Sequence, residues 1–244
     1  EAFDNIAVGG ATISDLWERN AGMADERLRK NLAKPWIEQH YSIPAEDWAD
    51  VWFDTNTSLT LNPSRRDEQF GKSQLDQVFD RGPEKLFINI GSNDGLFNAC
   101  FMGKMDESGF NVERYEGQLQ ELFRRLGELP SKTEKIIFNS LVRPRTVPNL
   151  MPAPDRLNSR PGDAYYDGYN ANLFSERISV TGQQLQDFDQ RVYHVNEYAR
   201  SAMESHLKSR GIFVDFFEAS SNFDAKHYPD RSIPARGRLL TNMP

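Results

Sequence analysis

Short apolar runs alternate with amphipathic helical patterns along this chain. The runs at 85–91 and 135–142 are continuous apolar stretches, which is typical of strands that are buried on both faces of a sheet. Further apolar runs at 3–10 and 212–217 predict two more strands. Patterns of helical periodicity separate the runs, at residues 12–33, 73–80, 112–126 and 181–209. This alternation predicts an α/β protein with a parallel sheet and helices on both of its faces.

Two stretches interrupt the alternation. Residues 34–72 hold three prolines and three of the four tryptophans, and residues 144–161 hold five prolines. We interpret 34–72 as an insertion or cap and 144–161 as a long loop, within a single domain that covers residues 1–244. The chain begins at Glu1, inside or next to a predicted strand, and ends abruptly at Pro244. We therefore expect a processed or partial chain, incomplete at the N-terminus and open to the same interpretation at the C-terminus.

Charge and composition exclude several classes of function. The chain carries 29 basic and 36 acidic residues, and the resulting net charge of −7 argues against a nucleic-acid binder. No apolar run reaches the roughly 18 residues of a membrane-spanning helix. The single cysteine, Cys100, excludes an intrachain disulfide and a cysteine-rich zinc site, and we interpret it as a buried, inert thiol. The four histidines lack the spacing of metal ligands, so we expect no metal site.

Two turns carry the chemistry that the sequence predicts. The tetrapeptide Gly-Ser-Asn-Asp at 91–94 follows one predicted strand, and the pair Gly9-Gly10 follows another. On composition alone both are ordinary tight turns. In a parallel sheet, however, both would lie at the carboxyl-terminal edge, where α/β proteins bind their ligands. The backbone N–H of Gly10 and the side-chain amide of Asn93 are both hydrogen-bond donors, and two such donors that converge form an oxyanion hole.

These turns, in this order, resemble two conserved blocks of the SGNH hydrolases, which are also called GDSL-type lipases and esterases. The stretch NIAVGGAT resembles the second block, with Gly10 as its glycine. The stretch INIGSNDGLFN resembles the third block, with Asn93 as its asparagine. The resemblance covers most of residues 3–217. With the alternation, it implies a three-layer α/β/α sandwich built on a parallel, flavodoxin-like sheet.

The nucleophile block of that family is missing from this chain. The family places its Gly-Asp-Ser block before the second-block glycine, but the nine residues that precede Gly10 include no serine. A partial match, Gly162-Asp163-Ala164, has alanine at the nucleophile position, lies far downstream and follows a proline-rich loop. We interpret this match as a coincidence. The resemblance therefore implies that the nucleophilic serine comes from a segment outside this chain, either upstream or on a companion fragment.

The family's histidine block has one candidate here. The string Asp224-Ala-Lys-His227-Tyr-Pro matches the family's Asp-x-x-His pattern, although it follows the last predicted strand closely and lacks the usual glycine. The resemblance implies that His227 is the catalytic base and that Asp224 orients it. The alternative is that both are ordinary loop residues and that the true block lies beyond Pro244. We expect His194 and His206 to be surface or packing residues, and His40 has no evident partner.

The aromatic residues of the 34–72 insertion allow two interpretations. Trp36, Trp48, Trp52 and Phe53 either form a small separate core, which the sequence slightly favours, or provide an apolar wall beside the active site for an acyl chain. The second interpretation makes lipid or acyl esters better candidates for the substrate than small acetylated sugars.

The resemblance implies a carboxylic ester hydrolase that acts through an acyl-serine intermediate. Such a reaction requires no metal and no organic cofactor, and the family implies secretion or a periplasmic location. A second hypothesis is a non-catalytic protein of this fold that has lost the nucleophile and now binds a ligand or serves as a structural subunit. A third is an unrelated α/β domain, such as a sugar or nucleotide binder, in which Asn93 belongs to a simple turn.

Overall fold

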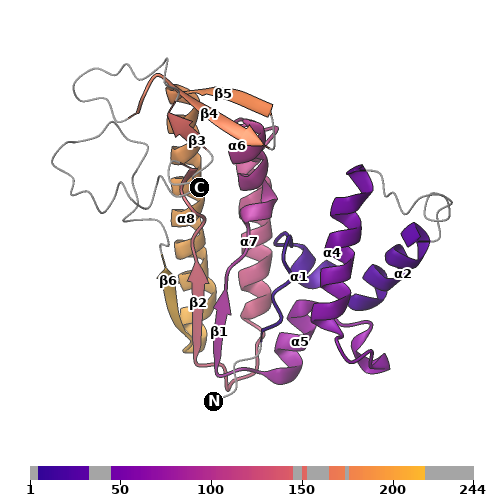
Figure 1. Cartoon of the computed structure of the whole chain (residues 1–244). Coiled ribbons are helices and arrows are strands. Elements are labelled where there is room, and N and C mark those ends of the chain that lie inside the picture. Colours follow the sequence, from indigo (N-terminus) through magenta and orange to yellow (C-terminus); the bar gives the residue numbers. More distant parts are fainter. Residues whose placement is uncertain (1–4, 33–44, 145–149, 153–164, 174–175, 218–244) are drawn as a thin grey trace, which may run out of the picture. The chain divides into compact units, whose positions relative to one another are not determined.

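The computed structural model describes residues 5–32, 45–144, 150–152, 165–173 and 176–217 (Figure 1). The chain divides into two compact units. The first unit holds residues 1–83 together with 129–132, and the second holds 84–128 together with 133–244. The organisation of residues 1–244 as a single domain stays a prediction.

The first unit is helical in its described part. It consists of α1 (Asp15–Glu18), α2 (Ala21–Leu32), α4 (Ala45–Leu61), a 3-10 turn (Asp67–Gln69) and α5 (Gln74–Arg81), with α2 packed against α4. One sequence prediction is wrong here. Residues 5–10 do not form a strand: the Ala7 N–H donates to Asn5 Oδ1, and the Ile6 carbonyl accepts a hydrogen bond from Gln74 Nε2. The 34–72 stretch, interpreted as an insertion or cap, contains the 17-residue helix α4.

The helix predicted over 12–33 is interrupted near Arg19. That residue has extended backbone angles (φ −109°, ψ 136°) and ends α1. Asn20 then starts α2, since its Oδ1 accepts a hydrogen bond from the Met23 N–H at 2.9 Å, which is the contact of an N-cap. The side chain of an asparagine thus starts a second helix where sequence periodicity alone suggested one continuous helix.

The predicted helix at 73–80 is confirmed as α5, with both ends encoded locally. Ser73 Oγ accepts a hydrogen bond from the Asp76 N–H at 3.2 Å, and Asp76 Oδ2 accepts one from the Ser73 N–H at 2.9 Å. This reciprocal capping box satisfies two amides of the first turn. Gly82, with φ +49°, closes the other end by donating its N–H to the Val78 carbonyl at 2.8 Å.

The second unit is built on a parallel sheet of three strands. These are β1 (Lys85–Ile88), β2 (Lys135–Asn139) and β6 (Phe213–Phe217), in the order β1-β2-β6. Ile88 pairs with Phe138, which in turn pairs with Phe216. The structure thus confirms a mixed α/β fold with a parallel sheet at three of the four predicted strand positions. The three-layer, flavodoxin-like arrangement stays a prediction.

One face of this sheet is packed against helices. Helices α6 (Leu96–Met102), α7 (Val112–Leu126) and α8 (Gly182–Leu207) belong to this unit, and α7 packs along α8. Ile136 and Phe138 of β2 are buried on the helical face, and the ring of Phe138 meets that of Phe123 from α7 at 5.3 Å. On the opposite face Phe87 is 55% exposed and Phe213 is 61% exposed. The prediction that the 85–91 strand is buried on both faces is therefore wrong for Phe87.

Helices α7 and α8 confirm the periodicity at 112–126 and 181–209. The Thr181 hydroxyl and Gln184 form a capping box at the start of α8. Farther along α8, the buried side chain of Asn196 holds the loop that follows β2. Its Oδ1 accepts the Leu141 N–H at 2.9 Å, and its Nδ2 donates to the Leu141 carbonyl at 3.1 Å. One side chain therefore satisfies both backbone groups of a residue outside any regular element.

A second sheet was not predicted from the sequence. Strands β3 (Leu150–Pro152), β4 (Gly168–Leu173) and β5 (Glu176–Thr181) pair antiparallel in that order. Tyr169 and Val180 are paired across β4 and β5, and both are buried. The segment 144–161, interpreted as a loop, thus contains one strand. The prolines and asparagines of these segments concealed the strands, because both residue types are depleted in sheets.

Candidate active site

The Gly-Ser-Asn-Asp segment forms a tight turn shortly after β1. We call residues 91–94 the GSND turn. Ser92–Asp94 form a single 3-10 turn, and the Asp94 N–H donates to the Gly91 carbonyl at 3.1 Å. Gly91 has φ +105°, and a Cβ atom at this position would lie only 2.1 Å from the Tyr115 Oη. Both the backbone angle and the available space therefore require glycine.

The side chain of Tyr115, from α7, packs against Gly91 of this turn. Its side chain is buried, and its ring packs against that of Phe110 with 5.3 Å between ring centroids. Burial, and next to it the negative charge of Asp94, raises the pKa of the Tyr115 phenol well above its usual range. The hydroxyl therefore stays protonated beneath Gly91 at neutral pH. Sequence periodicity assigned Tyr115 only to the buried stripe of a helix and did not reveal its position beneath the turn.

Tyr115 makes the stability of the second unit sensitive to alkaline pH. The phenol of an unfolded chain loses its proton near pH 10, whereas the folded state holds it to higher pH. The folded state then binds more protons, so the free energy of unfolding falls as the pH rises through and above that value. We expect Tyr115→Phe to reduce this loss.

Urea unfolding at about pH 8 and about pH 10.5 measures the effect, since the two values lie on either side of the usual tyrosine range. Tyr193→Phe, at a tyrosine of α8 that is 50% exposed, is the matched control. Equal losses of stability in the wild type and in Tyr115→Phe would contradict the prediction.

Asn93 lies at the exposed tip of the GSND turn. Its side chain is exposed, whereas Gly91 and Gly95 on either side of the turn are buried. The ends of the two neighbouring strands add polar groups at this edge, where Asn139 Nδ2 donates to Asn89 Oδ1 at 3.1 Å. The described carboxyl-terminal edge of β1 and β2 is therefore polar, and the GSND turn presents an amide from a rigid support.

The second predicted donor lies in the first unit, on what we call the glycine turn, residues 8–11. The Ala11 N–H donates to the Val8 carbonyl at 3.3 Å and closes the turn, and Gly10 has φ +89°. A Cβ atom at Gly10 would lie 3.2 Å from Phe53 Cδ2 and 3.4 Å from Trp52 Cζ3. Among the residues that the structure describes, the Gly10 N–H has no protein acceptor.

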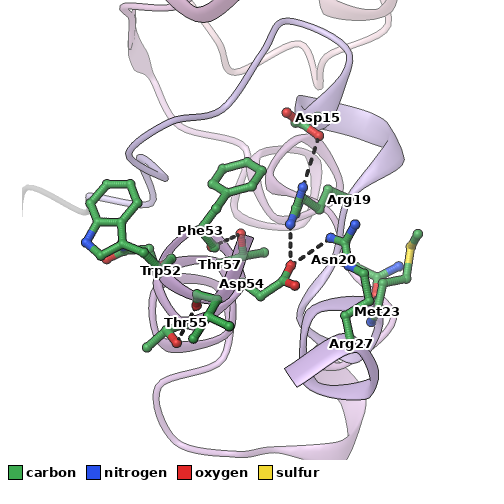
Figure 2. A network of polar contacts seen from close by, with 12 residues as sticks. Asp15, Arg19, Asn20, Met23, Arg27, Trp52, Phe53, Asp54, Thr55 and Thr57 are labelled. Carbon is green, nitrogen blue, oxygen red and sulfur yellow. Dashed lines mark hydrogen bonds and ion pairs between the residues drawn. The ribbon is translucent and has the colours of Figure 1, made fainter. Parts of the chain in front are cut away.

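A buried network of charges anchors α4 beside the glycine turn (Figure 2). The Asp54 side chain is only 1% exposed and accepts hydrogen bonds from Arg19 and, at 2.7 Å, from Arg27. Arg19 also lies 3.8 Å from Asp15 and stacks on the Phe53 ring, 3.6 Å from its centroid. Burial lowers the pKa of Arg19, and its hydrogen bond with Asp54 opposes this shift. Sequence reasoning missed this network, because single charged residues on helices carry no local signal of burial.

A second buried carboxylate, on α2, links α2 to α4. Asp25 of α2 accepts hydrogen bonds from the Ser58 hydroxyl of α4 and from Arg65 beyond the end of α4. Asp25 is 6% exposed. The two helices are therefore linked twice: Asp54 of α4 is bound by Arg27 of α2, and Asp25 of α2 is bound by Ser58 of α4.

The remaining sequence candidates have different outcomes. Asp224, His227 and the Gly162–Ala164 string lie outside the described residues, as do His40 and Trp36. Gly10 and Asn93 belong to different units, so their convergence on one oxyanion stays a prediction. His194 confirms its surface role, because its exposed Nε2 lies 3.0 Å from Glu116 Oε1. Cys100 is buried as predicted.

Two further observations concern membrane-spanning helices and metal ligands in the described part of the chain. Within its helices, none combines the length and the apolar character that a membrane crossing requires. Among the same residues, no cluster of three or more histidine, cysteine, aspartate or glutamate side chains is arranged to hold a metal ion. Compared with models of protein families, with curated proteins and with solved structures, the chain matches none.

Proposed function

We propose that this protein hydrolyses carboxylic esters through an acyl-serine intermediate. The observation that carries the proposal is the GSND turn, which presents Asn93 just beyond the carboxyl end of a parallel strand. Ligands of α/β sheets bind at that edge. The turn is held by Gly91, where a side chain would be strained and would collide with Tyr115, and by the buried Tyr115 itself. A backbone held in this way places the Asn93 amide where it can donate to developing charge.

In this proposal the serine Oγ attacks the ester carbonyl carbon and transfers its proton to His227, which Asp224 orients. The Asn93 side-chain amide donates to the oxyanion that forms. The family resemblance implies the Gly10 N–H as a second donor. When the oxyanion collapses, the alcohol leaves with the proton from His227. Water then attacks the acyl-serine by the same route and releases the acid. The serine comes from a segment outside residues 1–244, or from a companion fragment.

Two features of the glycine turn support its part in this mechanism. The Gly10 N–H has no acceptor among the described residues, and two aromatic side chains of α4, Trp52 and Phe53, pack against the turn. Gly9 and Gly10 themselves are exposed, so a substrate can reach them. The mechanism requires no metal ion and no organic cofactor.

Intact mass spectrometry tests the proposal. The protein isolated from its natural source is analysed under denaturing conditions, before and after treatment with a fluorophosphonate that labels activated serines. We expect one species to gain a single phosphonyl adduct, and its mass will show whether the serine lies on a longer chain or on a partner fragment. Heat-unfolded protein is the control, since labelling requires the assembled site.

The opposite result is equally informative. If the 28.0 kDa chain alone is found and stays unlabelled, the protein is not a working serine hydrolase. A non-catalytic binding or structural subunit of the same fold then becomes the leading hypothesis.

A further inference from the structure

Trp52 is the most exposed aromatic residue described in the first unit, and it lies against the glycine turn. Its side chain belongs to α4 and is 57% exposed. A Cβ atom built at Gly9 would lie 3.3 Å from Trp52 Cη2, and one built at Gly10 would lie 3.4 Å from Trp52 Cζ3. One edge of the indole therefore packs against both glycines, while more than half of the side chain stays open to solvent.

The charged groups near Trp52 are bound to one another. The next residue, Phe53, also packs on Gly10 and is covered on its ring face by the Arg19 guanidinium. Arg19 is held by the buried carboxylate of Asp54 (Figure 2). In the same view Trp52 projects from one side of α4, while Asp54 and Arg27 lie on the other. The charges are thus paired with each other and directed away from the indole.

From this arrangement we infer that Trp52 selects esters with an apolar acyl chain. The inference rests on the proposed function, because it requires a carbonyl oxygen at the Gly10 N–H. Such an oxygen lies about 3 Å from the Gly10 nitrogen. Because the indole edge packs against Gly9 and Gly10, the first methylene groups of the acyl chain then contact that edge. A straight alkyl chain covers the exposed indole surface, whereas an acetyl group is too short to reach across it.

A rigid aromatic side chain suits this role. Tryptophan offers a large apolar area and loses little conformational freedom on binding, because its side chain has only two rotatable bonds. Removal of both the chain and the indole surface from water favours longer acyl groups. Trp52 is therefore a specificity-determining residue, distinct from the donors Gly10 and Asn93.

The test uses the two carboxylate products, acetate and octanoate, so it does not depend on the serine. Both are titrated into the ¹⁵N-labelled 244-residue chain, and amide and indole resonances are followed by NMR. We expect the Gly10 amide to shift with both ligands. The Trp52 indole N–H, which is assigned by its loss in Trp52→Phe, should shift only with octanoate. Octanoate should bind about tenfold more tightly than acetate, the preference expected for a partly open apolar contact.

Variants separate recognition from folding. In Trp52→Ala the preference for octanoate should fall to about unity while acetate still shifts Gly10, and Trp52→Phe should keep part of the preference. Leu59→Ala is the matched control, because Leu59 is 54% exposed on the same helix, two turns beyond Trp52. We expect it to leave the preference unchanged.

Each other outcome has a separate meaning. If the preference survives in Trp52→Ala and the rest of the spectrum is native, the role of Trp52 is refuted while Gly10 remains a donor. If neither carboxylate shifts Gly10, the oxyanion role of Gly10 fails, and the inference on Trp52 fails with it.

Discussion

Replacement of Asp54 by alanine should remove a large part of the stability of the first unit. The Asp54 carboxylate is almost fully buried and is bound by Arg19 and Arg27. The Arg19 side chain is itself only 13% exposed, so the substitution leaves a guanidinium buried without its main counter-charge. Removal of one partner from a buried ion pair costs about 3–5 kcal/mol. A whole domain has a free energy of unfolding of only about 5–15 kcal/mol.

Urea unfolding followed by circular dichroism measures this loss. Asp50→Ala is the matched control, since Asp50 lies one turn earlier on α4 and is exposed. Surface substitutions of this kind usually change stability by less than about 0.5 kcal/mol. Asp54→Asn keeps the shape of the side chain and removes its charge, so it should have an intermediate effect. Equal unfolding midpoints for Asp54→Ala and Asp50→Ala would show that the network contributes little.

Replacement of Asn93 by alanine should reduce the turnover number of ester hydrolysis by about 10²- to 10³-fold. The proposed amide donates to the oxygen only as charge develops on it, so its loss acts on the transition state more than on the bound substrate. The Michaelis constant should change little. The measurement is made on the form of the protein that reacts with the fluorophosphonate, with a soluble nitrophenyl ester.

Ser92→Ala is the control for Asn93→Ala. Ser92 is the neighbouring exposed residue of the same turn, and its substitution tests whether any change in the turn reduces the rate. Asn93→Asp adds a second comparison, because it keeps the size of the side chain but replaces the donor with a negative charge. Full activity in Asn93→Ala would remove Asn93 from the oxyanion hole, and equal losses in both alanine variants would make its role structural.

Sequence patterns predicted the parts of this fold that depend on local signals. Helices α5, α7 and α8 combine amphipathic periodicity with side-chain caps from Ser73, Asn111 and Thr181. The parallel strands were found because their apolar runs are continuous. The hairpin of β4 and β5 was missed, since β4 contains glycine and two asparagines, which are depleted in strands.

For the candidate site, the sequence predicted the turns but not the residues that support them. Gly10 and Gly91 were identified as turn residues, and their positive φ angles confirm that assignment. Their supporting contacts were not predictable, because they come from residues distant in sequence. Tyr115, which lies against Gly91, belongs to α7, 24 residues later in the chain. Phe53, which lies against Gly10, belongs to α4, and α1 and α2 come between the two residues in sequence. Single-residue patterns carry no information about such pairs.

Two hydrogen bonds join the Asn196 side chain to the Leu141 backbone, and they couple the opening of the segment around Leu141 to that of helix α8. The Leu141 amide exchanges with solvent only after its bond to Asn196 opens, and Asn196 lies in the middle of α8, a helix of 26 residues. Local openings in proteins involve cooperative groups of residues. The segment that follows β2 therefore shares the protection of α8 against hydrogen exchange, although it has no regular structure of its own. Around Leu141, the absence of a helix or strand does not imply mobility.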